Sequence, residues 1–309
     1  FTKTIKKIMS MTHHKIQDCA ILTMDNLENF EAYDHLLAQP LLALGWQMHM
    51  VSWHDKSVNW NDYAAVIIRS PWDYQDDAAE FLKVLTDIEQ SSAHLENSLL
   101  TVEWNIDKKY LRELVSLDVN IVKTLWRKNL TPQQLDQYFT ELNVDQLVIK
   151  PRISANADNT FWLTKENHQT LYPQLAQAFS ASEFLVQPFM KNVIDEGEFS
   201  LFYFNGHYSH AILKTPKDDD FRVQEEHGGR LRSITPEASL TKHAEQALKA
   251  IKTLIGMPLY ARVDFVRCEQ GFALMEAELI EPSLYFNMDE QSATRFADAF
   301  VHRMQALTL

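Results

Sequence analysis

The stretch ARVDFVRCEQGFALMEAE, residues 261–278, contains two apolar runs separated by a short polar connection. This pattern predicts two neighbouring β-strands. Asp264 lies in the first run, and Glu276 and Glu278 lie in the second. Because side chains two residues apart point to the same face of a strand, we expect both glutamates on one face of the sheet.

The three carboxylates predict a metal site. Like charges placed together cost free energy unless a cation lies among them, and Mg²⁺ prefers carboxylate and phosphate oxygens. A strand face that is only solvated is the alternative, but Leu274, Met275 and Ala277 make the surroundings apolar. We therefore expect Mg²⁺, or Mn²⁺ in its place, bound by Asp264, Glu276 and Glu278.

Composition restricts the class of protein. The chain has 309 residues, enough for two or three domains that share a cleft, and 46% of them are hydrophobic. The net charge of −13 argues against a nucleic-acid partner. Cys19 and Cys268 have no CxxC spacing, so a reducing cytoplasm is expected. The longest apolar stretch, 41–51, is too short for a membrane span.

The first hundred residues predict a small α/β domain. Expected strands cover 19–23, 47–52 and 64–69, and expected helices cover 33–44 and 78–89. The basic residues 1–17 read as a leader outside the fold.

Clear local signals continue along the rest of the chain. Asn105–Asp107 could cap a helix that ends near Leu117, and Thr131–Gln134 has the pattern of a capping box. Asn205-Gly206 predicts a hairpin turn. The remaining expected strands are 146–150, 184–188, 198–204 and 207–214, and the remaining expected helices are 241–255 and 291–304.

Two lysines have positions suited to a polyphosphate. Lys150 ends the apolar strand Val148–Pro151, and Lys108 lies at a helix entry. Lysines so placed can neutralise the negative charges of ATP, although isolated lysines are more often solvated.

The serial order of these features resembles the ATP-grasp superfamily over roughly residues 100 to 290. In detail it is most similar to the glutathione-synthetase-like and D-cycloserine-ligase-like branch, whose RSTWDY element resembles Arg69–Tyr74. The matching segments are Trp104–Lys108, Lys150-Pro151, Val186–Phe189, Glu196–Ser200, Leu213–Gln224, Ala261–Asp264 and Met275–Tyr285.

The resemblance implies an α/β (α+β) ATP-grasp fold with an N-terminal βαβ domain, a small lid and a C-terminal mixed sheet. The implied divisions are 1–17, a leader; 18–104, a substrate-side α/β domain; 105–185, a central region with the lid; and 186–309, the C-terminal ATP-grasp domain. Residues 152–160 depart from the family, because the usual glycine-rich phosphate loop contains no glycine here. Glu278 also replaces the usual metal-ligand asparagine.

The resemblance also implies site residues. ATP would be bound through Lys108 and Lys150, through backbone groups at Gln187, Pro188 and Phe189, and through Glu196 or Glu198, which the sequence does not separate. Catalytic cations would be Lys214, Arg222 and Arg262. Arg222 lies in the polar stretch 214–230, which reads equally as a mobile loop over the site or a solvated surface loop. The substrate pocket would contain Arg69, Trp72, Glu281, Ser283 and Tyr285.

The function implied is an ADP-forming ligase. It would join a small amino-acid-like carboxylate to an amine through an acyl phosphate. A small-molecule phosphotransferase and an ATP-binding module without turnover are the alternatives. Small-molecule carboxylate and amine partners, no membrane, and a homodimer are compatible with this sequence. Serine hydrolase, zincin, Rossmann and P-loop motifs are missing.

Overall fold

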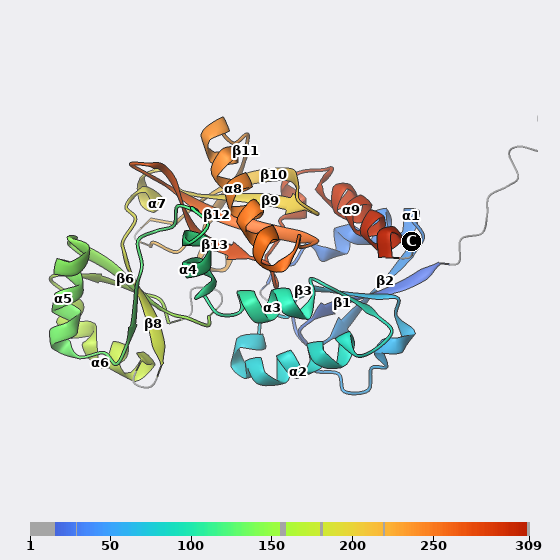
Figure 1. Cartoon of the computed structure of the whole chain (residues 1–309), viewed down its shortest axis with the longest axis horizontal. Coiled ribbons are helices and arrows are strands. Elements are labelled where there is room, and N and C mark those ends of the chain that lie inside the picture. Colours follow the sequence, from blue (N-terminus) through green and yellow to red (C-terminus); the bar gives the residue numbers. More distant parts are fainter. Residues whose placement is uncertain (1–15, 29, 155–158, 180–181, 219, 308–309) are drawn as a thin grey trace, which may run out of the picture.

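The structure is a computed structural model, and it describes residues 16–28, 30–154, 159–179, 182–218 and 220–307. The expected leader therefore lies outside the described residues up to residue 15, whereas Gln17 already begins the first strand. Figure 1 shows three sheets: a lid sheet at the left, a central sheet at the upper middle and an N-terminal sheet at the lower right.

The N-terminal sheet is parallel and has the strand order β2-β1-β3-β4. This confirms the expected α/β beginning. The expected helix over 78–89 is α2, and it buries Phe81, Leu85 and Ile88 against the sheet. The elements are β1 (Gln17–Thr23), α1 (Ala38–Ala43, after a 3-10 turn over Asp34–Leu37), β2 (Trp46–Ser52), β3 (Ala65–Ser70), α2 (Ala78–Glu89), β4 (His94–Glu96) and α3 (Leu99–Asn105).

The lid sheet is antiparallel and has the order β5-β8-β6-β7. Helix α5 begins with the expected capping box at Thr131. Two helices pack against the sheet around Phe179 and Phe184. The domain boundary expected between residues 185 and 186 falls inside strand β8, which pairs with β5 and β6 of the lid sheet. The elements are β5 (Leu125–Lys128), α5 (Pro132–Leu142), β6 (Gln146–Pro151), β7 (Phe161–Thr164), α6 (His168–Phe179) and β8 (Glu183–Pro188).

The central sheet has the order β11-β10-β9-β12-β13, and its neighbours are antiparallel. The expected turn at Asn205-Gly206 joins β9 to β10, with φ of 47° and 81°. A short helix, α7, precedes β9. The elements are α4 (Tyr110–Val115), α7 (Asn192–Asp195), β9 (Glu198–Phe204), β10 (His207–Thr215), β11 (Arg230–Ile234), α8 (Ala238–Ile255), β12 (Tyr260–Cys268), β13 (Gly271–Glu278) and α9 (Ser292–Leu307).

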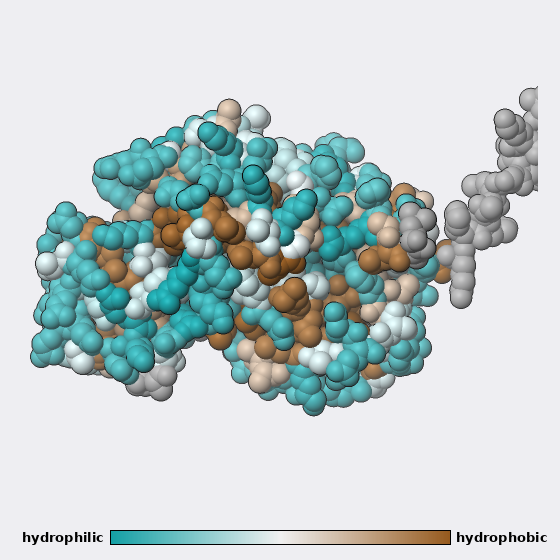
Figure 2. Space-filling view, in the orientation of Figure 1, coloured by the Kyte–Doolittle hydropathy of each residue, from teal (hydrophilic) through white to brown (hydrophobic). Residues whose placement is uncertain are grey.

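Both faces of the central sheet are covered. Leu201 and Tyr203 of β9 pack with α4 and α8, whereas Phe202 and Phe204 pack with α9, α1 and the N-terminal sheet. This alternation ties the N-terminal and central sheets into one core. In Figure 2 hydrophilic residues cover most of the visible face, and hydrophobic ones gather where α3, α4 and α8 lie. No described helix is both long and apolar enough to cross a membrane.

The Asp107 carboxylate accepts from Lys109 N–H (2.9 Å) at the expected helix entry, but the bounds of the helix differ from the prediction. Helix α4 begins at Tyr110, has Lys109 at its N-cap, and ends at Val115 rather than near Leu117. The Asn105 side chain instead donates to Ala277 O (2.8 Å) and accepts from Leu279 N (2.9 Å). This amide therefore fixes the helix entry against β13.

His210 on β10 is buried in the same core. Its ring stacks on Phe202 with the centroids 4.2 Å apart. Its Nε2–H donates to Leu284 O (3.1 Å), and Nδ1 lies 2.9 Å from the Ser209 hydroxyl. Burial lowers the pKa of His210 from 6.5 to about 4.

We expect His210 to make the protein less stable in mild acid. Between pH 6.5 and about 4 the unfolded chain binds a proton that the folded chain does not, so the free energy of unfolding falls as pH falls, by up to ~3 kcal/mol. Urea unfolding at pH 7 and pH 5 would measure this loss. His210→Gln should lose less than the wild type, whereas His302→Gln at an exposed position should match it. Equal losses in all three proteins would contradict the assignment.

Candidate active site

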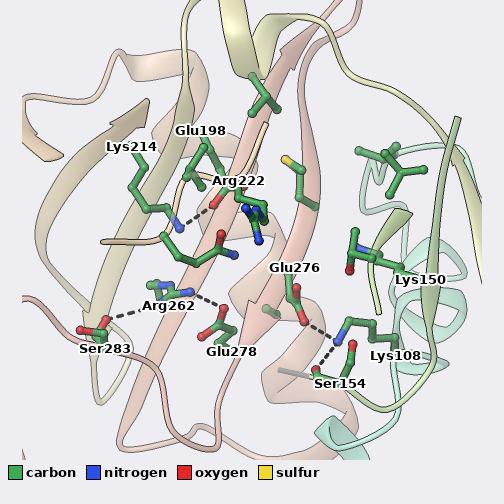
Figure 3. A pocket seen from close by; sticks show the side chains of 18 of the residues that line it. Lys108, Lys150, Ser154, Glu198, Lys214, Arg222, Arg262, Glu276, Glu278 and Ser283 are labelled. Carbon is green, nitrogen blue, oxygen red and sulfur yellow. Dashed lines mark hydrogen bonds and ion pairs between the residues drawn. The ribbon is translucent and has the colours of Figure 1, made fainter. Parts of the chain in front are cut away.

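A large cleft lies where the lid sheet faces the central sheet and the residues that follow β3. It encloses about 1510 Å³ of empty space, including its open mouth, which is ample for a nucleotide and a second small molecule. Figure 3 shows charged side chains converging on it from both sides. The predicted site residues that line it are Trp72, Lys108, Lys150, Gln187, Pro188, Phe189, Glu198, Lys214, Arg222, Arg262, Glu276, Glu278, Glu281, Ser283 and Tyr285.

One end of the cleft is apolar. Phe189, just after β8, stacks on Trp162 with the centroids 4.6 Å apart, and Phe221 packs edge-on against both rings. The Gln187 amide donates to Thr124 Oγ1 (2.9 Å). The Phe189 N–H already donates to Gln146 O, and proline has no N–H, so this end offers mainly an apolar surface for a flat ring.

The middle of the cleft gathers the two predicted phosphate lysines. Lys108 Nζ lies 2.9 Å from Glu276 Oε1 and donates to Ser154 O (2.8 Å). Burial lowers the pKa of Lys150, and the nearby Glu276 carboxylate opposes that change. Burial alone would raise the pKa of Glu276, but Lys108 and Lys150 lower it. The two lysines therefore face the same carboxylate.

The register of β12 and β13 builds the other polar wall. Arg262 pairs with Glu278, and Asp264 pairs with Glu276, across the two strands. The Arg262 guanidinium donates to Glu278, to Asp264 Oδ2 (3.1 Å) and to Ser283 O (3.3 Å). Burial raises the pKa of Glu278 to about 8 although Arg262 opposes it.

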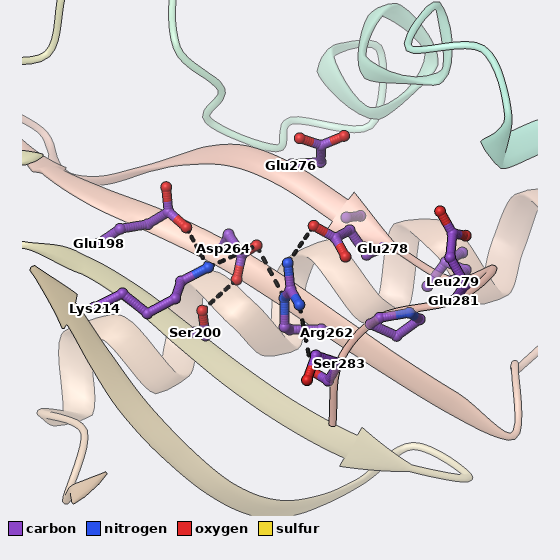
Figure 4. A network of polar contacts seen from close by, with 12 residues as sticks. Glu198, Ser200, Lys214, Arg262, Asp264, Glu276, Glu278, Leu279, Glu281 and Ser283 are labelled. Carbon is purple, nitrogen blue, oxygen red and sulfur yellow. Dashed lines mark hydrogen bonds and ion pairs between the residues drawn. The ribbon is translucent and has the colours of Figure 1, made fainter. Parts of the chain in front are cut away.

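Asp264 does not line the cleft, contrary to its predicted role as a metal ligand. It lies beneath the cleft, where it accepts from Ser200 Oγ (2.5 Å) and pairs with Lys214 Nζ (3.4 Å) and Arg262. Figure 4 shows this buried network. Over the described ranges, no group of three or more His, Cys, Asp or Glu side chains is placed to hold a metal ion. The physical reason is that Lys214 and Arg262 already pair with the Asp264 carboxylate.

The cleft nevertheless suits a divalent cation. Glu198, Asp264 and Glu278 share only Lys214 and Arg262, which leaves one carboxylate charge in this group unbalanced. Burial is the main cause of the raised pKa of Glu278, and the neighbouring carboxylates of Asp264 and Glu276 raise it further. Hard carboxylate oxygens facing an open cleft are the ligand type that Mg²⁺ prefers.

Glu198, and not Glu196, faces the cleft. Glu198 pairs with Lys214 (2.5 Å), whereas Glu196 turns away and pairs with Arg267 (2.8 Å). Gly197 between them has a φ of 123°, and a Cβ there would lie 2.8 Å from Lys214 O. This turn sends the two side chains in different directions, which the sequence did not reveal.

Arg69 is a second correction, because it is fully buried outside the cleft. Its guanidinium pairs with Asp34 (3.0 Å) and donates to Pro282 O (2.8 Å). Trp72 lines the cleft with its ring, while its indole N–H donates to Glu281 O (2.8 Å). Both residues hold the backbone of the segment Leu279–Leu284 by donating to its carbonyl oxygens.

That segment, Leu279–Leu284, is held to an unusual degree. Each of its six consecutive carbonyl oxygens accepts a hydrogen bond from a side chain of another element, so its side chains are presented in fixed directions. The donors, in order, are Asn97, Tyr260, Trp72, Arg69, Arg262 and His210. The sequence did not predict the roles of Asn97, Tyr260 and His210. A side chain that donates to a distant segment has no signal in the residues next to it.

The stretch 214–230 lies over the cleft and contacts several parts of the molecule. Val223 is buried against the central sheet, Phe221 packs on the lid, and the Tyr33 hydroxyl donates to Glu225 (3.3 Å). Arg222 extends into the cleft (Figure 3) and is held by a two-pronged pair with Asp220. Of the glycine-free loop 152–160, residues 155–158 lie outside the described residues.

The chain is similar to known proteins over most of its length. Residues 19–97 match the model of the D-cycloserine synthetase DcsG N-terminal domain. The cycloserine biosynthesis protein DcsG of Streptomyces lavendulae is 27% identical over 87% of this chain and 93% of that protein. A crystal structure of D-cycloserine synthetase DcsG superposes with a TM-score of 0.83 at 26% identity, over 93% of this chain and 99% of that one.

The chain has the ATP-grasp fold. D-alanine–D-alanine ligase from Bacillus anthracis, complexed with ATP, shares the fold of this ATP-grasp chain at a TM-score of 0.67 and 14% identity, over 94% of this chain and 98% of that one. The expected fold is confirmed, and the protein is an ATP-dependent ligase.

We expect the Arg69–Asp34 pair to show strong energetic coupling in this ATP-grasp enzyme. Arg69→Met leaves a buried carboxylate and the Pro282 carbonyl without their donor, which should lower the free energy of unfolding by about 3–5 kcal/mol. Asp34→Asn with Arg69→Met should be less destabilised than the sum of the single variants by more than about 1 kcal/mol. Urea unfolding of the four proteins would measure the coupling, and simple additivity would contradict it.

Proposed function

We propose that this enzyme uses ATP to convert the carboxylate of a small amino-acid-like substrate into an acyl phosphate, from which an amine displaces phosphate. The observation that carries the proposal is the set of five cationic side chains facing one cleft, together with two carboxylates of strand β13. Such a wall suits a triphosphate with its divalent cation. The cations are Lys108, Lys150, Lys214, Arg222 and Arg262, and the carboxylates are Glu276 and Glu278.

ATP would lie along the cleft with its base at the apolar end beside Phe189. Lys108 and Lys150 would then face the phosphates as point charges. Glu276 and Glu278 would hold Mg²⁺, or Mn²⁺, which supplies charge neutralisation for the transferring phosphoryl group. Lys108 would exchange its present partner, Glu276, for a phosphate oxygen.

The first chemical step is phosphoryl transfer. A carboxylate oxygen of the substrate attacks the γ-phosphorus, and the bond between that phosphorus and the ADP oxygen breaks. Lys214 and Arg262 would stabilise the charge on the transferring group, because Asp264 holds both cations in place beneath the cleft. Arg222 would approach from the loop over the cleft.

The second step is amide formation. The amine nitrogen attacks the carbonyl carbon of the acyl phosphate, the carbon–oxygen bond to phosphate breaks, and the nitrogen releases one proton. Phosphate leaves with the bonding electron pair. The products are the new carbon–nitrogen bond, ADP and inorganic phosphate.

Trapping with hydroxylamine tests this sequence. Incubation of the enzyme with Mg²⁺-ATP, hydroxylamine and a panel of D- and L-amino acids should yield a hydroxamate in equal amount to ADP and phosphate for at least one acid. Hydroxylamine attacks an acyl phosphate at its carbonyl carbon, so a phosphotransferase acting on an alcohol would give ADP without hydroxamate or free phosphate. That second result would refute the proposal.

Substitutions at the phosphate end should separate turnover from folding. Lys150→Ala and Glu276→Gln should each reduce ADP formation by at least about 100-fold, because each removes a charge that faces the transferring group. Circular dichroism and the melting temperature should stay close to those of the wild type. Lys165→Ala, at an exposed lid position, is the matched control and should keep full activity. Wild-type turnover in either cleft variant would remove these residues from the site.

A further inference from the structure

Glu281 differs from Glu198, Glu276 and Glu278, three other acidic side chains that line the cleft. Over the described residues, no lysine, arginine or histidine forms an ion pair with it, although burial is substantial. In Figure 4 its side chain stands apart from the dashed network around Arg262. Its three neighbours on the wall are each paired, namely Glu198 with Lys214, Glu276 with Lys108, and Glu278 with Arg262.

The surroundings of Glu281 hold its carboxylate in the cleft without neutralising it. The Tyr74 hydroxyl is hydrogen-bonded to it, and Ile106 and Ile280 line the cleft nearby. Burial raises the pKa of Glu281 to about 7, although the Tyr74 hydroxyl and the positive charge of Lys108 oppose that change. A hydrogen bond from a neutral hydroxyl offsets only part of the cost of burial.

The backbone at Glu281 is held by side chains of other elements. Its carbonyl oxygen is fixed by the Trp72 indole, and the next carbonyl, of Pro282, is fixed by Arg69. The proline ring also restricts the chain at that point. The carboxylate is therefore held toward the cleft as a preformed site for a cationic group.

We propose that Glu281 and Tyr74 form the subsite that binds the ammonium group of the substrate. The inference rests on the proposed function and names the chemical class of the substrate, a carboxylic acid that carries a primary amine. An ammonium group supplies the missing positive charge and has three donors for the Glu281 carboxylate and the Tyr74 oxygen. A hydroxyl at the same position supplies no charge, so the site discriminates against hydroxy acids.

Binding without turnover tests the subsite. Thermal shifts in Mg²⁺ and a non-hydrolysable ATP analogue would be measured with D- and L-alanine and serine, and with lactate and glycerate, which replace the amine by a hydroxyl. In the wild type, at least one amino acid should bind more tightly than its hydroxy acid. Glu281→Gln should weaken amino-acid binding by about 10- to 100-fold and leave hydroxy-acid and nucleotide binding unchanged.

Further variants complete the test. Tyr74→Phe should weaken amino-acid binding by about 2- to 10-fold, and Glu281→Asp, which keeps the charge, should retain the preference for amines. Glu290→Gln, at an exposed position, is the matched charge control and should behave as the wild type. These variants decide the matter if Glu281→Gln does not fold.

The outcomes separate the two proposals. Glu281→Gln with an unchanged preference for amines, or a wild type to which no amino acid of the panel binds, would overturn the subsite. Amine selectivity that depends on Glu281, combined with no hydroxamate from any amino acid, would refute the acyl-phosphate chemistry alone.

Discussion

The buried Asp264 carboxylate is the interaction on which the cleft depends. It lies under the sheet surface, where it holds Lys214 from β10 and Arg262 from its own strand. Charges removed from water are tolerated only when they are paired and hydrogen-bonded, so the pairing fixes both cations with their heads toward the cleft. Ser200 completes the hydrogen bonding of Asp264 from β9. Three strands thereby share one carboxylate as a common anchor.

A second constraint joins the N-terminal and central sheets. The carbonyl oxygens of Leu279–Leu284 accept from donors on both sheets, so this segment forms the seam between them. A backbone held in this way presents its side chains with little freedom, which is what discrimination between small substrates requires. The same seam explains why Arg69 is buried. Its guanidinium stabilises the fold, because it pairs with Asp34 and donates to the Pro282 carbonyl oxygen.

Much of the fold could be predicted because its signals are local. The capping box at Thr131 and the turn at Asn205-Gly206 are encoded within a few residues, and both form as expected. Strands β6 and β9 were also visible as apolar runs. By contrast, β7 and β11 were missed because they have only four and five residues, and so short a run does not distinguish a strand from a loop.

For the candidate site, the sequence by itself determined which side chains gather in one region: three lysines, two arginines and the pair Glu276 and Glu278, whose spacing places them on one strand face. Only the tertiary structure decided their roles. It separated Glu198 from Glu196 by the turn at Gly197, placed Asp264 beneath the cleft and, among the described residues, left Glu281 without an ion pair. The physical reason is that partners of a buried charge come from distant strands, and their distances are set by packing and register rather than by neighbouring residues.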